Sequence, residues 1–90
     1  MGKYVYLSFI SWLPGGDQDK FNKQVVPKLH NDKVELLHHG FSYGTIEDYV
    51  MVHRTDLDIE AYTNFRGEAC TIDGKNWIDH ARTVTSVPWK

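Results

Sequence analysis

Hydrophobic and polar residues alternate along four segments of the chain, a pattern typical of β-strands with two unlike faces. The segments are residues 3–12, 33–41, 48–55 and 82–87. The second and third segments follow each other closely, so we expect them to form a hairpin whose turn spans residues 42–47. Gly40 predicts a bulge near the end of the second strand, because an isolated glycine in a strand often marks one.

The segment between the first two strands predicts a helix that a proline interrupts. Asp17 follows a Pro-Gly-Gly turn and can cap the start of this helix. Apolar residues then recur every four positions, at Phe21, Val25 and Leu29. Pro27 has no amide hydrogen and its ring clashes with the preceding turn, so we expect it to kink the helix or to end it.

A second helix is predicted after the third strand. Residues 55–58 supply N-capping side chains and acidic charge, which favour a helix start. Apolar residues recur at helical spacing, at Ile59, Tyr62, Phe65 and Ala69. The helix should run to about Cys70. Residues 71–80 are less regular, with a turn expected at Asp73-Gly74.

These elements follow one another in the order β-α-β-β-α-β, which is the order of ferredoxin-like folds. We therefore predict an α+β protein, a ferredoxin-like βαββαβ fold, in which a four-stranded antiparallel sheet carries two helices on one face. Ninety residues suit one domain, so residues 1–90 should form a single ferredoxin-like domain. Its core is small, and a partner could complete it.

Composition and charge narrow the choice of partners and compartment. The net charge is −2 and the ten basic residues are scattered, so we expect no nucleic-acid partner. All apolar runs are far shorter than the ~20 residues of a transmembrane helix, so we expect no membrane partner. Cys70 is the only cysteine, which excludes an intramolecular disulfide and agrees with a reducing, cytoplasmic location.

Two helices that cover one face of a sheet leave the other face open. The residues expected beneath the helices are Val5, Leu7, Phe9, Val50 and Val52. The residues expected on the open face are Tyr4, Tyr6, Ile10, Tyr49 and Met51. A soluble monomer rarely exposes an apolar and aromatic patch of this size. We therefore expect a homodimer or a higher homo-oligomer that assembles through the open sheet face.

The central part of the chain, VELLHHGFSYGTIEDYVMVHRTDLDIEAYTNF, resembles a known family. The matching residues are Gly44, Asp48, Tyr49, Val50, Val52, Asp56 and Ala61, and the closing ARTVTSVPW is similar to that family's last strand. The resemblance is to the Gly-Tyr-Asp-type small domains of the dimeric α+β barrel superfamily. It implies a ferredoxin-like subunit paired through its sheets. Many members have no established activity, and others are cofactor-free oxygenases, isomerases, haem-handling enzymes or effector-binding modules.

The polar rings of the predicted strands suggest a small-molecule site beside the sheet. The candidate ligand-binding residues are Tyr4, Tyr6, Ser8, Tyr49, Met51 and His53. Their hydroxyl and imidazole groups could orient a small, flat or carboxylate-bearing molecule, while the ring bodies supply apolar contact. The other interpretation, which we favour, is that these residues fill a packed dimer interface, because interface cores are also rich in Tyr and Met.

Histidines are the candidates for catalysis. His39 and His53 are expected on the same side of the hairpin, where an imidazole could act as a general acid or base. No HxH or HExxH spacing predicts a metal site, and no motif predicts a cofactor. The favoured function is a small-molecule-binding or structural homodimer. The alternative is a cofactor-independent oxygenase- or isomerase-like enzyme that acts on a small organic substrate in the cleft.

Overall fold

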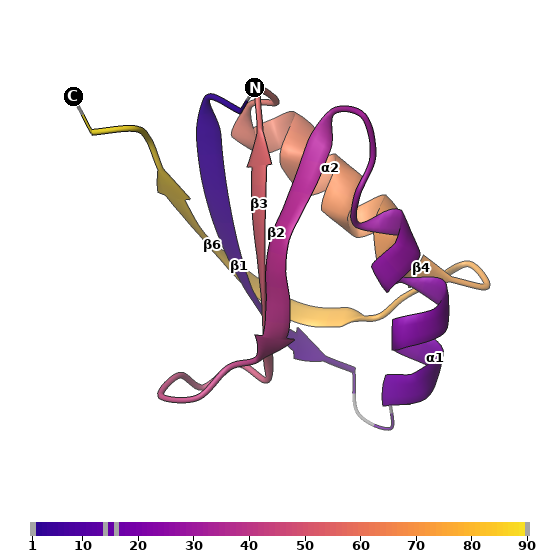
Figure 1. The fold of residues 1–90 in the computed structure, drawn as a ribbon. Helices are drawn as coiled ribbons and strands as arrows, with labels where there is room; N and C mark the ends of the chain where they lie inside the picture. The colour runs from indigo at the N-terminus through magenta and orange to yellow at the C-terminus, as the bar shows by residue number, and fades with distance from the viewer. Residues whose placement is uncertain (1, 14, 16, 90) are drawn as a thin grey trace.

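A four-stranded antiparallel sheet forms the body of the protein in the computed structural model, which describes residues 2–13, 15 and 17–89. The strands are β1 (Tyr4–Trp12), β2 (Val34–Phe41), β3 (Tyr49–Thr55) and β6 (Ile78–Ser86). Their order across the sheet is β2-β3-β1-β6 (Figure 1). All three pairings are antiparallel, which confirms the predicted α+β class and the four-stranded antiparallel sheet.

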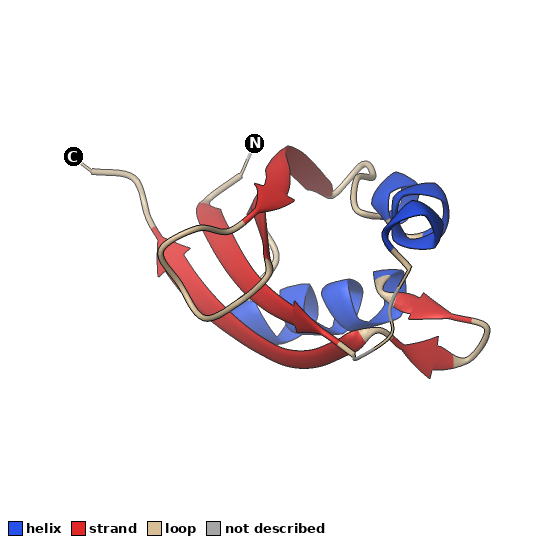
Figure 2. Cartoon of the chain, turned by 90° about the horizontal axis from the view of Figure 1, so that it is seen from below, coloured by secondary structure: helices blue, strands red, loops and turns tan. Residues whose placement is uncertain are grey.

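Two α-helices lie on the same side of the curved sheet (Figure 2). They are α1 (Gln18–Gln24) and α2 (Ile59–Ala69), and the 3₁₀ turn η1 (Val26–Lys28) follows α1. Asp17 caps α1 by accepting hydrogen bonds from the amides of residues 19 and 20, and Asp58 caps α2 by accepting one from Ala61. Pro27 lies in η1, so the helix ends before the proline as predicted. No helix of the described residues is long and apolar enough to cross a membrane.

A small second sheet separates α2 from the last strand. It consists of β4 (Thr71–Ile72) and β5 (Lys75–Asn76), joined by the turn expected at Asp73-Gly74. Both turn residues have positive φ, 52° and 77°, which is the geometry that an Asp-Gly pair favours in a tight hairpin. Because of these extra strands, the predicted βαββαβ order is not matched, although the main sheet and the two helices are compatible with a ferredoxin-like fold.

The bulge in β2 lies earlier than predicted. The register with β3 shifts between Leu36 and His38, so Leu37 is the extra residue, whereas Gly40 pairs regularly with Val50. The shift turns Leu36 toward the helices and His38 toward the open face. The prediction at Gly40 was wrong because a glycine permits a bulge, while the side chains that must be buried on each face decide its position.

The two faces of the sheet are assigned opposite to the prediction. Tyr6, Ile10 and Met51 are buried, with 1%, 0% and 0% of their surface exposed, and they pack beneath the helices. Val5, Leu7, Phe9, Val50 and Val52 alternate with them and lie half-buried on the other, open face. The expected position on the open face was therefore wrong for Tyr4, Tyr6, Ile10, Tyr49 and Met51, as was the expected position beneath the helices for the five residues that alternate with them.

The helices explain this reversal, because they supply partners for the polar groups of the covered face. Tyr6 donates a hydrogen bond from Oη to the carbonyl of Leu57, at 2.8 Å, just before α2. Ser8 and Tyr62 of α2 share a hydrogen bond of 2.8 Å between their hydroxyl oxygens. A buried polar group that lacks a partner costs free energy, so a polar strand face is stable beneath helices only where the helices pair with it.

The hydrophobic core lies between the sheet and both helices. Phe21, Val25 and Leu29 are all buried there, as the helical spacing predicted. Tyr62 stacks on Tyr6 from the other helix, with their ring centroids 4.4 Å apart. Ile59, which was expected on the inner side of α2, is instead 47% exposed.

Candidate functional site

The six predicted ligand-binding residues lie on one face of the sheet, the face that the helices cover. Tyr4, Tyr6, Ser8, Tyr49, Met51 and His53 come from the paired strands β1 and β3. Tyr4 is half-buried, and the other five are buried. They do converge, as the alternation predicted, but Ser8, Met51 and His53 have no exposed surface at all. These three side chains are enclosed by protein and do not form the rim of an open cleft.

Four buried side chains form a continuous chain of hydrogen bonds between the sheet and the helices. Nε2 of His53 is 2.7 Å from the carbonyl oxygen of Leu29, and its Nδ1 is 2.8 Å from the hydroxyl of Tyr62. The same hydroxyl is 2.8 Å from Oγ of Ser8, and Nη1 of Arg66 donates to that Oγ at 2.9 Å. This series of hydrogen bonds therefore ends at the backbone carbonyl of Leu29 on one side and at the guanidinium of Arg66 on the other.

The two ends decide the direction of every hydrogen bond in this chain. A carbonyl only accepts, so Nε2 of His53 carries the hydrogen and donates to Leu29. Nδ1 of His53 is then without a hydrogen and accepts from the Tyr62 hydroxyl. A guanidinium only donates, so Ser8 accepts from Arg66 and donates in turn to Tyr62. Each neutral group acts once as donor and once as acceptor.

Burial keeps His53 and Tyr62 neutral and unreactive at physiological pH. Loss of hydration lowers the pKa of His53 to about 4, against the opposing effect of its hydrogen bond to Leu29. Burial likewise raises the pKa of Tyr62 to about 12. Both nitrogens of His53 are already engaged, so this histidine cannot accept a substrate proton unless the core opens. Its geometry is that of a structural residue.

Arg66 is the one member of this hydrogen-bond series that was not predicted from the sequence. Its side chain is 7% exposed, it donates to Ser8 and to Oγ1 of Thr83, and its Cζ lies 5.7 Å from the centre of the Tyr62 ring. Arg66 follows Tyr62 by four residues, so the two share one face of α2. That spacing was the available signal, but a charged residue is normally expected on the solvent side of a helix.

A cavity lies between α1 and the end of β2. Its volume is about 160 Å³, and its lining residues are Trp12, Gln18, Asn22, His39, Gly40, Phe41 and Tyr49. Aromatic rings make most of the wall. The Trp12 and Tyr49 centroids are 5.3 Å apart, and His39 lies 5.9 Å from Tyr49. We call this space the α1 cavity.

Two polar atoms of the α1 cavity residues have no hydrogen-bond partner. Nε1 of Trp12 and Oη of Tyr49 are both buried and unpaired, and the only other such side-chain atom among the described residues is Nε of Arg66. Burial also raises the pKa of the Tyr49 hydroxyl, so this group keeps its proton. Buried polar atoms in native proteins are nearly always paired, so these two atoms are exceptions, and with almost no accessible surface they lie behind the cavity wall.

Only part of this cavity was predicted from the sequence. Tyr49 and His39 were candidates, whereas Gln18, Asn22 and Phe41 were not. Gln18 and Asn22 are four residues apart and share one face of α1, which the sequence does show. It does not show that this polar face borders the end of β2, because that contact depends on how the helix lies across the sheet.

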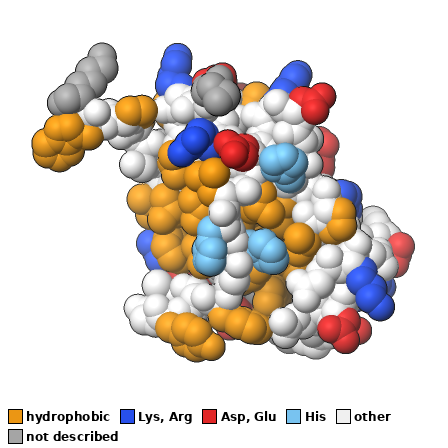
Figure 3. Space-filling model, viewed as in Figure 1, with side chains coloured by type: hydrophobic (Ala, Val, Ile, Leu, Met, Phe, Trp, Pro, Cys, Tyr) orange, Lys and Arg blue, Asp and Glu red, His pale blue; other side chains and the backbone are white. Residues whose placement is uncertain are grey.

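The open face of the sheet is apolar at its centre and charged at its rim (Figure 3). Its apolar residues are Val5, Leu7, Phe9, Leu37, Val50, Val52 and Val84. At the rim, Nε and Nη2 of Arg82 each donate to a carboxylate oxygen of Glu47 at 3.2 Å, and this pairing lowers the pKa of Glu47. The Arg82 guanidinium also lies 4.4 Å from the centre of the Phe9 ring.

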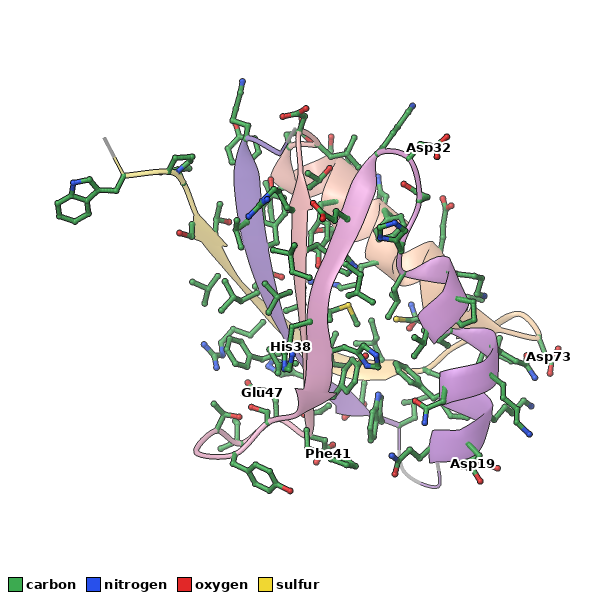
Figure 4. The ribbon with its side chains drawn as sticks, in the orientation of Figure 1. Asp19, Asp32, His38, Phe41, Glu47 and Asp73 are labelled. Atoms are coloured by element: carbon green, nitrogen blue, oxygen red, sulfur yellow. The ribbon has the colours of Figure 1, made fainter. Side chains whose placement is uncertain are left out.

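Glu47 belongs to the loop between β2 and β3, whose tip is strongly exposed. Figure 4 shows Glu47 and Phe41 near the lower end of β2, where this loop joins the sheet. Phe41, Tyr43 and Ile46 are 54%, 90% and 90% exposed.

Among the residues that the structure describes, no three His, Cys, Asp or Glu side chains lie close enough to hold a metal ion.

Comparison of the chain with protein-family models, with curated proteins and with solved structures found no match.

Proposed function

We propose that this protein is a small-molecule-binding module that works as a homodimer, with a ferredoxin-like subunit of the dimeric α+β barrel type. The observation that carries the binding function is the α1 cavity, whose wall is mostly aromatic and whose exposed edge includes the amides of Gln18 and Asn22. A ligand in the cavity could pack against the rings and form hydrogen bonds with these amides. No cofactor is part of this proposal.

The open sheet face supports the homodimer. Seven apolar side chains share it, no helix covers it, and Leu37 and Val84 are 41% and 43% exposed. The charges at its rim are already paired within the subunit, Arg82 with Glu47 and Arg54 with Glu35. A second copy could therefore pack its own apolar face here without burying an unpaired charge. Two sheets packed face to face would give the dimeric barrel.

Adjacent residues of β6 test the dimer with a matched control. Val84 lies on the open face, and Thr85, the next residue along, points to the opposite side and is also exposed. We expect Val84→Asp to weaken association at least tenfold, since a buried unpaired carboxylate costs well over the ~1.4 kcal/mol of a tenfold change. Thr85→Asp should leave the dimer intact. Sedimentation equilibrium at micromolar concentration decides, and a monomeric parent protein would refute the dimer.

An enzyme is the second candidate, because one histidine borders the α1 cavity. His39 is exposed at its edge, and no hydrogen bond to another protein group engages its ring among those described. It is therefore the better placed of the two predicted catalytic histidines, since His53 is enclosed in the core. A cofactor-independent oxygenase or isomerase would need His39 within about 3 Å of a substrate proton.

A fragment screen tests whether the cavity binds small molecules. We would record ¹H–¹⁵N spectra of the labelled protein, identify the indole signal of Trp12 with Trp12→Phe, and add neutral, anionic and cationic fragments of varied size. We expect at least one chemical class to shift the Trp12 signal saturably. The indole of Trp89, which is 98% exposed, should not respond and serves as the internal control. If no class shifts the Trp12 signal, the binding function is wrong.

His39→Ala separates the two candidates once a fragment is known. If the protein only binds, the variant should change affinity modestly and no product should form with the parent protein. If it is an enzyme, the parent should convert the fragment in a pH-dependent reaction that His39→Ala abolishes.

A further inference from the structure

Two segments outside the sheet expose large apolar side chains. One is the loop between β2 and β3, residues 42–48, where Tyr43 and Ile46 are each 90% exposed. The other is the segment after β6, residues 87–89, where Val87 is 61% exposed and Trp89 is 98% exposed. We call these segments the hairpin loop and the tail. A packed Trp side chain buries about 150–250 Å², so an indole left in water forgoes a large apolar contribution to stability.

The hairpin loop and the tail lie at opposite ends of the sheet and on the same side of it. Figure 1 shows the loop below the sheet and the C-terminus beyond the upper end of β6. Glu47 of the loop pairs with Arg82, which lies on the open face, so the loop leans toward that face. In Figure 2 the tail also extends away from α1. The open face therefore has an exposed apolar segment at each end.

The open face alone is small for a stable dimer interface. Four strands about 4.8 Å apart, with about seven residues each at about 3.3 Å per residue, cover about 450 Å². A standard interface buries about 800 Å² of each partner. The two segments can supply much of the difference, because each aromatic side chain that packs there adds about 150–250 Å².

The charge of the hairpin loop decides which segments meet. Two sheets related by a two-fold axis can pack with like ends together or with opposite ends together. Asp48 is exposed, alternates with the buried Tyr49, and forms no salt bridge among the described residues. Like ends together would bring the two Asp48 carboxylates close to each other, and like charges that face each other weaken an interface. Opposite ends together keep these carboxylates apart and bring each tail to the partner's hairpin loop.

We infer that the tail of each copy packs on the hairpin loop of its partner, with Trp89 of one copy against Tyr43 and Ile46 of the other. This inference rests on the proposed homodimer and names the contacts that complete its interface. Trp and Tyr are among the residues that contribute most to binding at protein interfaces. Pro88 fixes one backbone angle of the tail, which reduces the conformational entropy that the tail loses on packing.

Truncation of the exposed side chains tests the inference without disturbing the core. We would measure the dimer Kd of the parent protein, Trp89→Ala and Tyr43→Ala by sedimentation over a dilution series. We expect Trp89→Ala to weaken the dimer at least tenfold and Tyr43→Ala about fivefold. Ile59→Ala is the matched control, because Ile59 is 47% exposed on α2, on the covered side of the sheet. It should leave Kd unchanged.

The double variant tests whether these two residues contact each other. Within one subunit both side chains are almost fully exposed, so any coupling between them arises in the dimer. In the Tyr43→Ala background the contact is already reduced, so Trp89→Ala should weaken the dimer less than fivefold further, and not by the full factor of ten. If tails met tails, the effect of Trp89→Ala would be the same in both backgrounds.

The outcomes distinguish this inference from the proposed function. If the parent protein dimerises and Trp89→Ala changes Kd less than twofold, the tail contact is wrong and the homodimer stands. If Trp89→Ala weakens the dimer equally in both backgrounds, the tail belongs to the interface but the hairpin loop is not its partner, and the inference is again wrong. A monomeric parent protein would refute the inference together with the homodimer.

Discussion

Two buried tyrosines should respond in opposite directions to the same substitution. The Tyr62 hydroxyl donates to Nδ1 of His53 and accepts from Ser8, at 2.8 Å in each case. The Tyr49 hydroxyl has no partner. The two residues are buried almost equally, because 4% of the surface of Tyr49 and 0% of that of Tyr62 is exposed. Replacing either residue by Phe removes one oxygen atom and leaves the ring. The effect on stability therefore reports whether that oxygen is paired.

The expected magnitudes follow from these partners. Tyr62→Phe leaves Nδ1 of His53 without a donor and the Ser8 hydroxyl without its acceptor, both in the core. Leaving a buried group unpaired costs about 1 to 3 kcal/mol, so we expect a loss of about 2 to 3 kcal/mol. Tyr49→Phe removes an unpaired hydroxyl and leaves nothing unpaired, so we expect a gain of about 1 kcal/mol. For a domain of this size, that gain raises Tm by about 5 °C.

Urea unfolding followed by far-UV circular dichroism measures both effects. All variants must be compared at one protein concentration, because the stability of a homodimer depends on it. Equal m-values would show that the unfolded states are comparable. Tyr43→Phe, at an exposed position, is the control and should stay within about 0.5 kcal/mol of the parent protein.

One result would refute the reasoning. If Tyr49→Phe destabilised the protein as much as Tyr62→Phe, the Tyr49 hydroxyl would have a partner of equal strength, and the contrast between the two tyrosines would be refuted. If the two substitutions had no effect at all, the hydrogen-bond chain of the core would make no net contribution.

Further expectations concern three other residues. Burial lowers the pKa of His53 from 6.5 to about 4, so between these pH values the unfolded protein binds a proton that the folded protein does not. The stability that His53 contributes should therefore be complete above pH 6.5 and fall by about 3 kcal/mol toward pH 4. Urea unfolding at several pH values measures this loss, which His53→Gln should abolish and His80→Gln, at an exposed position, should not. The Cys70 thiol is buried with its pKa raised to about 11, so iodoacetamide should modify it at pH 8 only in urea. Asp58→Ala should cost about 1 kcal/mol through the lost α2 cap.

Local signals predicted much of the fold. Asp17 and Asp58 cap the two helices because a short acidic side chain before a helix can accept from its free amides. Pro27 ends α1, and Asp73-Gly74 makes a tight turn. Each of these effects acts within four residues of chain. The hairpin β4–β5 was missed because two-residue strands are too short to alternate.

The faces of the sheet could not be predicted in the same way. Alternation separates Val5, Leu7 and Phe9 from Tyr6 and Ile10, but both sets are apolar enough to be buried. Hydrophobicity favoured the first set, whereas the helices cover the second. Which set is buried depends on whether residues far away in sequence can form hydrogen bonds with Ser8 and His53. Tyr62 pairs with both of them, and the carbonyl of Leu29 pairs with His53.

The same reversal explains the fate of the predicted site. Polar groups that share one strand face can serve a ligand, or they can pair with protein, and the sequence shows only that they share the face. In this protein α2 brings Tyr62 and Arg66 to the middle of that face, so Ser8 and His53 are paired and closed to a ligand. At its end the same face meets the short helix α1, whose Gln18 and Asn22 border the cavity without pairing to Tyr49. The polar face is thus structural where the helix over it is long and pairs with it, and the binding site that we propose lies where the helix is short.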